Sequence, residues 1–305
     1  MIVEQEQQIK YTFSGHEKFQ CRQLWLKKGY DYIESGKAFS DEDSVIELGV
    51  GKNMVSSIRH WLKAFGITDS NDQITDFGTL LLSSNGFDPF LEDDASLWLL
   101  HYHLVKSAYA STFYLIFNEF RKDKLLFDAD LYDAYIKRKS SITPYLNHNR
   151  NTVHTDFEIF KKMYLSSDEK SKSVEDSFSG LLTDLNLIKV TLKEADDFIQ
   201  KKKKVTEFYS IENAERDSIP VEIILYAILD NYQDSISIGL NSLEQDFNSP
   251  GAVFALSKAG LAAKLEEAEK KYSFISYTDH AGIKELQIKE KVEAVEMLRK
   301  YYDAK

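Results

Sequence analysis

The sequence contains little cysteine, proline and glycine for its length. Its 305 residues include one cysteine, Cys21, with 4 prolines and 13 glycines. A single cysteine excludes an internal disulfide and a metal site built from several thiolates. Because glycine and proline interrupt regular elements, their scarcity favours a mainly helical chain over a sandwich or barrel of short strands.

Long apolar runs are also missing. No window approaches the roughly eighteen apolar residues that a membrane helix needs. The most apolar stretch, residues 95–105, is shorter and contains His101 and His103. The first residues are polar and acidic, unlike a signal peptide. We therefore expect a cytoplasmic protein without a membrane partner.

Several catalytic signatures are absent. The chain has no Gly-x-x-x-x-Gly-Lys-Ser/Thr loop, no Gly-x-Ser-x-Gly elbow and no His-Glu-x-x-His motif. The run Gly-Val-Gly-Lys-Asn at residues 49–53 resembles a phosphate loop, but it lacks the first spacing and the hydroxyl after lysine. These absences argue against ATP hydrolysis by a P-loop.

The charge balance is acidic, with a formal net charge of −11. Such a chain cannot bind DNA through bulk attraction, so any DNA contact requires local basic patches. Hydrophobic residues make up 43% of the chain and aromatic residues 13%, which excludes a disordered protein. The length allows two or three domains.

Residues 41–84 have the order of a winged helix-turn-helix. Ser40 or Asp41 can cap a short helix, and Gly49 and Gly51 interrupt it. A second helix starts near Lys52 and ends at Gly66. Its apolar face repeats at helical spacing. That face consists of Met54, Val55, Ile58, Trp61, Leu62 and Phe65.

The polar flank of this second helix could enter a DNA major groove. Its predicted DNA-binding residues are Lys52, Asn53, Ser56, Arg59 and His60. Two Ile-Thr pieces on either side of a polar turn at residues 70–73 predict a wing after the helix. The alternative is that this module packs against protein, as many winged helices do.

The fold prediction is mainly α with small β-hairpins, arranged in two or three modules that resemble winged helices. We expect units at residues 1–125, 126–215 and 216–305. The second unit should contain helices at 156–164 and from 173 onward, then a hairpin whose basic tip could contact phosphates. That tip consists of Lys201, Lys202, Lys203 and Lys204. The alternative is a solvated charge run.

His16 and Glu17 are the first candidates for chemistry. They lie in a glycine-containing turn flanked by Phe13 and Phe19. Histidine titrates near neutrality and can act as a general base or a metal ligand, and the neighbouring glutamate could help to hold a metal. The alternative is that His16 forms local hydrogen bonds and braces the turn.

Asp88 and Glu92 are the candidate metal ligands, because clustered carboxylates bind Mg²⁺. Asp93 or Asp94 should instead cap the buried helix that follows. Capping is also the alternative for the whole cluster. His101 and His103 lie about 200° apart on a helix and cannot easily share a metal. His101 is expected in the core, satisfied by a hydrogen bond.

Four ordered motifs resemble one bacterial family. They are FSGHEKF at residues 13–19, ELGVGKNMV at 47–55, DPFLE at 88–92 and LWLLH at 97–101. The family is encoded beside sulfur-transfer genes in defence islands, and SspB, the nicking subunit of the single-strand DNA phosphorothioation system, is its best understood member. Lys18 stands where that family would be expected to have threonine, and Phe90 where it would have tyrosine.

The resemblance implies a part in replacing a non-bridging phosphate oxygen of DNA by sulfur. Partner subunits would supply sulfur from cysteine and activate it with ATP, while this subunit would bind double-stranded DNA and nick one strand. His16 and Glu17 are assigned to nicking because they stand in the most distinctive motif, with Mg²⁺ or Mn²⁺ as the expected metal. The alternatives are a non-catalytic adaptor that recruits sulfur-transfer proteins and a transcriptional regulator. A homodimer is left open.

Overall fold

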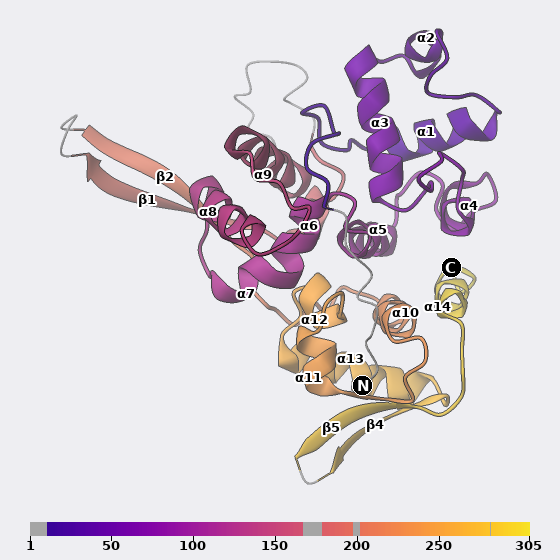
Figure 1. Cartoon of the computed structure of the whole chain (residues 1–305). Coiled ribbons are helices and arrows are strands. Elements are labelled where there is room, and N and C mark those ends of the chain that lie inside the picture. The colour runs from indigo at the N-terminus through magenta and orange to yellow at the C-terminus, as the bar shows by residue number, and fades with distance from the viewer. Residues whose placement is uncertain (1–10, 167–178, 198–201, 281) are drawn as a thin grey trace.

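The computed structural model of the chain describes residues 11–166, 179–197, 202–280 and 282–305. These residues form mainly helices, with one two-stranded and one three-stranded antiparallel sheet. Figure 1 shows the helices gathered in the body of the molecule and two hairpins that extend from it. The prediction of a mainly α fold with small hairpins is confirmed.

The N-terminal part is a group of four helices. They are α1 (Trp25–Glu34), α2 (Ser44–Leu48), α3 (Lys52–Ala64) and α4 (Asp76–Leu82). Gly49 ends α2 with a left-handed φ of 60°, and Gly51 is the N-cap of α3, as the sequence predicts. The predicted wing after α3 is reduced to one β-bridge between Thr68 and Ile74.

A second group of helices surrounds the long helix α5. It consists of α5 (Asp94–Lys106), α6 (Ser111–Leu115), the π-helix η1 (Ile116–Phe120), α7 (Arg121–Asp123), α8 (Ala129–Ser140) and α9 (Arg150–Tyr164). The Asp93 side chain accepts a hydrogen bond from the backbone N–H of Ala95, so the predicted cap of α5 is confirmed. Nearly all side chains of α5 are buried, which makes it the central helix.

The middle of the chain departs from the expected helix after residue 173. Residues 173–178 lie outside the described part, and the described continuation is a turn followed by the short 3-10 helix η3 (Thr183–Leu185). Gly180 approaches the backbone of α9 so closely that a Cβ there would lie 2.2 Å from the carbonyl oxygen of Lys162. Asn186 then turns the chain with a φ of 49°. From residue 179 onward, this close packing and turn stand in place of the predicted helix.

The predicted hairpin follows as β1 (Lys189–Asp197) and β2 (Lys202–Ser210), and Figure 1 shows it extending from the body. Lys201 lies outside the described residues. The backbones of Lys202, Lys203 and Lys204 pair with Asp197, Asp196 and Ala195 respectively. These lysines therefore belong to the start of β2, beside the tip of the hairpin.

The C-terminal part combines helices with the three-stranded sheet. Its elements are α10 (Val221–Asn231), β3 (Ser237–Gly239), α11 (Leu240–Gln245), α12 (Pro250–Val253), α13 (Lys258–Lys271), β4 (Ile275–His280), β5 (Ile283–Ile288) and α14 (Ala294–Tyr302). The strand order is β3-β5-β4, so β5 lies between the other two. Pro250 stands at the first turn of α12, where its missing N–H costs no hydrogen bond.

Buried apolar side chains from all three parts form one contiguous core. Helix α5 contacts α6, α10, α12 and η3. These contacts of α5 join the parts of the chain around it. A smaller cluster of Tyr32, Leu48 and Val55 holds α2 against α1 and α3. The division into units at 1–125, 126–215 and 216–305 stays a prediction. In the described part of the chain, no helix has the length and apolar character to cross a membrane.

Candidate functional site

The backbone around His16 is unusual. Ser14, Gly15, Glu17 and Lys18 all have positive φ, at 68°, 90°, 48° and 66°. For a residue with a side chain, this conformation costs roughly 1–3 kcal/mol and persists only where surrounding contacts enforce it. Backbone strain of this kind gathers at functional sites and ligand clamps. We call residues 13–19 the SGHE loop.

His16 is the anchor of the SGHE loop. The residue is 4% exposed, and its Nε2 lies 3.0 Å from Asp156 Oδ1 on α9. The backbone N–H of Lys18 donates to His16 Nδ1 at 3.1 Å, so Nδ1 is unprotonated and Nε2–H donates to the carboxylate. Both ring nitrogens are thus engaged within the chain. This is the arrangement expected if His16 braces the turn.

Asp156 is the residue that sequence reasoning missed. Its carboxylate also accepts from the Ser14 backbone N–H at 2.9 Å and from Thr112 Oγ1 at 3.4 Å. The sequence did contain a signal for its burial: Asp156 falls at helical spacing among the apolar residues Val153, Phe157 and Phe160. A buried carboxylate in such a stripe needs a donor.

The SGHE loop is seated on helix α3. The His16 ring stacks over Trp61, with centroids 6.2 Å apart, and Trp61 Nε1 donates to the carbonyl oxygen of Phe19 at 3.0 Å. A Cβ on Gly15 would lie only 2.7 Å from Nδ1 of His60. The SGHE loop and α3 therefore form one structural unit.

Four of the predicted DNA-binding residues lie on the outer face of α3. Lys52, Asn53, Ser56 and Arg59 are all exposed. Glu17 and Lys18 of the SGHE loop are exposed as well, while His16 beneath them is buried. The structure therefore brings the predicted polar flank and the predicted catalytic motif onto the same part of the molecule.

The prediction that His60 faces outward is wrong. His60 is 5% exposed and packs its ring edge-on against Trp61 at 5.0 Å. Burial, with smaller effects from His16 and Lys63, lowers the pKa of His60 to about 3, so the imidazole is neutral. One residue after Arg59, it points about 100° around the helix, toward Trp61 and the SGHE loop.

Arg59 is held by an acidic partner. Its Nη2 lies 2.6 Å from Asp72 Oδ2, and its Nε donates to the same carboxylate. Lys63 approaches that carboxylate at 3.0 Å. Burial raises the pKa of Asp72, but the hydrogen bonds from Arg59 and Lys63 outweigh it and hold that pKa below its usual range. A cavity of about 410 Å³ adjoins this pair and is lined by polar groups that include Lys37, Asn71 and Gln73.

Asp88 and Glu92 do not form a fitting metal site. Asp88 accepts hydrogen bonds from the backbone N–H of Glu92 and of Asp93 and, at 2.6 Å, from Ser96 Oγ. Its oxygens therefore serve as a cap, which was the structural alternative. Lys305 pairs with Asp93 and places a cation beside the cluster. Among the described residues, no three or more His, Cys, Asp or Glu side chains are arranged to hold a metal ion.

His101 and His103 belong to the core. His101 Nε2 donates to the Val253 carbonyl oxygen at 2.8 Å, and Nδ1 accepts from Tyr164 OH at 2.8 Å. Burial lowers the pKa of His101 to about 3 and that of His103 to about 4. The prediction of a satisfied core histidine at position 101 is confirmed.

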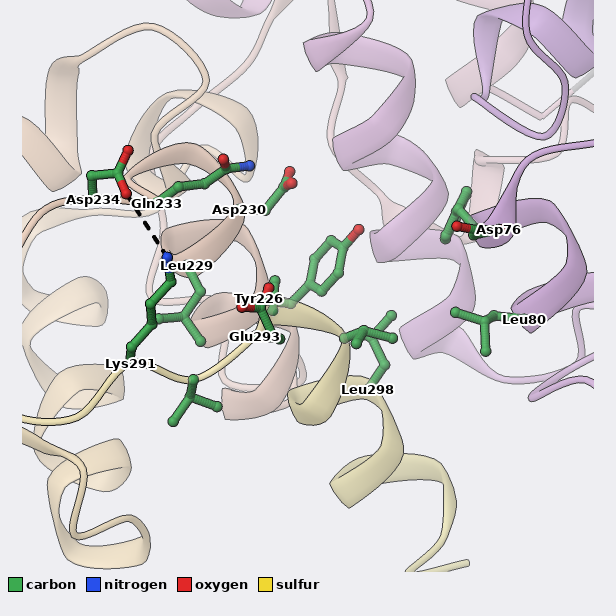
Figure 2. A pocket seen from close by; sticks show the side chains of 14 residues that line it. Asp76, Leu80, Tyr226, Leu229, Asp230, Gln233, Asp234, Lys291, Glu293 and Leu298 are labelled. Carbon is green, nitrogen blue, oxygen red and sulfur yellow. Dashed lines mark ion pairs between the residues drawn. The ribbon is translucent and has the colours of Figure 1, made fainter.

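A separate cavity of about 320 Å³ lies between α4, α10 and α14 (Figure 2). Its acidic groups include Asp76, Asp230 and Asp234, and Lys291 lies 3.9 Å from Asp234. Asp230 is already paired with Lys106 at 2.5 Å. None of the predicted site residues lines this cavity.

The comparisons with known proteins agree with the motifs. The profile of a family described as "Protein of unknown function (DUF4007)" matches residues 13–302. Two solved structures are similar, a crystal structure of SspB and a magnesium-bound crystal structure of SspB. Each is 26% identical with a TM-score of 0.80, and the match covers 96% of this chain and 88% of that chain. The likeness to SspB is thereby confirmed. No curated protein matches.

Proposed function

The chain belongs to the DUF4007 family, and from its likeness to SspB we propose that it is a subunit of a DNA phosphorothioation system. In this proposal it acts in the cytoplasm with sulfur-transfer and ATPase subunits. It binds double-stranded DNA and nicks one strand during antiphage defence.

The placement of the SGHE loop beside the exposed face of α3 carries the proposal. Lys52, Asn53, Ser56 and Arg59 face solvent from α3, and Glu17 and Lys18 face solvent from the loop. In the proposed complex α3 lies in the major groove, where its polar side chains reach base edges and phosphates. The loop then lies close to the DNA backbone.

His16 and Glu17 have different roles in this proposal. Glu17 is the exposed carboxylate and is the group that acts at the phosphodiester. His16 is a positioning residue, because its Nε2 and Nδ1 are used by Asp156 and Lys18. The proposed requirement for Mg²⁺ or Mn²⁺ is supported by the magnesium-bound SspB structure alone, and Asp88 and Glu92 do not supply the site.

The C-terminal part supports a second DNA-binding module. Its order is helix α10, strand β3, helices α11 to α13, then strands β4 and β5, with β5 in the middle of the sheet. A winged helix has this order of elements and strands. We include it in the proposal as one of two or three winged-helix-like modules, with the β1–β2 hairpin and its lysines as a further phosphate contact.

A plasmid-nicking assay tests the proposal. The purified chain with Mg²⁺ or Mn²⁺ should convert supercoiled plasmid to the open circle, and Glu17→Gln should abolish the conversion. Glu290→Gln changes another exposed glutamate, two residues after β5, and should nick normally. Normal nicking by Glu17→Gln would remove Glu17 from the mechanism.

A non-catalytic adaptor is the second candidate, with a transcriptional regulator as a variant of it. The engaged nitrogens of His16 favour this candidate, as does the lack of a ligand cluster among the described residues. An adaptor would shift duplex DNA in a gel and would never nick it, with either metal.

A further inference from the structure

The end of α8, the loop that follows it and the start of α9 have an unusual charge. Between Asp133 and Asp156 the sequence contains Lys137, Arg138, Lys139 and Arg150 but no aspartate or glutamate. This stretch thus has four cations and no carboxylate, in a chain with a net charge of −11. It is a local basic patch of the kind that an acidic protein needs in order to bind a polyanion.

Two of these cations have no partner among the residues that the structure describes. Lys139 lies 2.6 Å from Glu119, and Arg150 lies 2.6 Å from Asp130, so both are neutralised. Lys137 and Arg138 are exposed, and their side chains form no ion pair or hydrogen bond within the part of the chain that the structure describes. Their charges are available to a ligand.

The loop beside them exposes two large apolar side chains. Ile142 is 79% exposed and Tyr145 is 74% exposed. Leu146, next to Tyr145, is 4% exposed and inserts into the core. The backbone N–H groups of Ile142 and Thr143 donate to the carbonyl oxygen of Lys139. The loop is thus fixed to α8 while its apolar side chains stay outside.

The other end of the loop is fixed as well. His148 Nε2 lies 2.7 Å from Asp133 Oδ1, and Asn149 caps α9 by accepting from the backbone N–H of Thr152. An ordered loop presents an aromatic ring to a ligand with little loss of conformational entropy on binding.

We propose that Lys137, Arg138, Ile142 and Tyr145 form a binding site for single-stranded DNA. Tyr145 stacks on an unpaired base with Ile142 beside it, and the two cations contact the flanking phosphates. Duplex DNA offers phosphates but keeps its base faces stacked, and an acidic peptide offers charge without a flat ring for Tyr145. Only an unpaired strand uses both features of the loop.

This site goes beyond the proposed duplex contact because it uses other residues and another form of DNA. It lies on the α8–α9 side of the molecule, while α2 and the start of α3 lie on the other side (Figure 1). Arg150 and Asp156 are six residues apart on α9, about 9 Å along the helix axis. Helix α9 therefore joins the α8–α9 loop to Asp156, which holds the SGHE loop.

Fluorescence anisotropy with a labelled oligothymidine and the full chain tests the site. Stacking on an aromatic side chain is worth on the order of tenfold or more in affinity for each base, so Tyr145→Ala should weaken binding about tenfold and Tyr145→Phe should restore it. Lys137→Glu and Arg138→Glu should each lower the magnitude of the salt slope by about 0.7. Phe90→Ala, which removes another exposed ring, should bind normally.

Three results would overturn the proposal: unchanged affinity in Tyr145→Ala, an equal loss on an abasic oligonucleotide, or an equal loss of binding to polyglutamate. The last would assign the surface to an acidic protein. Because Tyr145 is exposed, its variants should unfold at the same denaturant concentration as wild type. Lys52→Glu should weaken duplex binding and leave oligothymidine binding unchanged, so a failure of the duplex proposal is separable from a failure of this one.

Discussion

The carboxylate of Asp156 accepts hydrogen bonds from His16 Nε2 at 3.0 Å and from the Ser14 backbone N–H at 2.9 Å. These contacts join α9 to a loop 140 residues earlier in the chain. They also explain how four residues of that loop keep a positive φ, because the carboxylate holds the loop at two points.

Replacing Asp156 by alanine should destabilise the protein by about 1–3 kcal/mol, since it leaves the donors of His16 and Ser14 unpaired in a buried place. Guanidinium unfolding measures the change. Glu158→Ala, on the same helix but exposed, should change the free energy of unfolding by less than about 0.5 kcal/mol. Equal effects of the two substitutions would mean that the carboxylate does not hold the loop.

Gly15, compared with two glycines between α2 and α3, gives a graded test of the SGHE loop. Gly15→Ala should be the most damaging, because φ is 90° and the new Cβ would lie 2.7 Å from His60 Nδ1. Gly49→Ala adds only left-handed strain of about 1 kcal/mol, since no described residue other than its chain neighbours comes within 4 Å of the new Cβ. Gly51→Ala meets neither obstacle and should be nearly neutral. Thermal unfolding should rank the three variants in this order.

A different rank would contradict the close approach of Gly15 to His60. In particular, a neutral Gly15→Ala would require the loop to move away from α3. If the loop did move away, Gly15→Ala should also lose the hydrogen bond from Trp61 Nε1 to the Phe19 carbonyl oxygen. Near-ultraviolet circular dichroism of the tryptophan would report that loss.

Helix periodicity and capping rules were enough to predict α3 and α5. Six apolar residues at helical spacing and the flanking glycines predict α3, and Asp93 predicts the start of α5. The partner of His16 could not be predicted, because nothing local relates a loop at residue 16 to a carboxylate at residue 156. His60 was misplaced because its polarity suggested exposure, whereas its position on the helix faces Trp61.

Asp72 restrains the predicted DNA-binding face of α3. Because it pairs with both Arg59 and Lys63, Asp72→Asn should release two cations and strengthen duplex binding. It should also increase the magnitude of the salt slope by about 1 to 2, because one or two more phosphates are neutralised. Gel shifts over a salt series measure both. Asp303→Asn changes an exposed carboxylate near the C-terminal end and should leave affinity and slope unchanged.

Asp72→Asn removes a negative charge from this face of α3, whereas Lys52→Glu adds one and should weaken duplex binding. Lys270→Glu makes the same substitution at an exposed lysine on α13 and is the control. If Lys52→Glu and Asp72→Asn both bind the duplex as wild type does, α3 is not the DNA-binding helix, and the alternative of a protein-docking surface is favoured.

His101 should make stability depend on pH. Burial lowers its folded-state pKa to about 3, against about 6.5 in the unfolded chain. Between these values the unfolded state binds a proton that the folded state does not, so stability falls as pH falls below about 6.5. Each such histidine contributes a slope of up to about 1.4 kcal/mol per pH unit. His60 and His103 act in the same direction, with pKa values lowered to about 3 and about 4.

Urea unfolding between pH 5 and 7 should therefore show a smaller pH slope in His101→Gln than in wild type, by up to about 1.4 kcal/mol per unit below pH 6.5. Tyr164→Phe is the matched control, because it removes the hydroxyl that donates to His101 Nδ1 and keeps the imidazole. It should lower stability at every pH and leave the slope unchanged. A wild-type slope in His101→Gln would mean that residue 101 titrates alike in the folded and unfolded states, which contradicts its burial between Val253 and Tyr164.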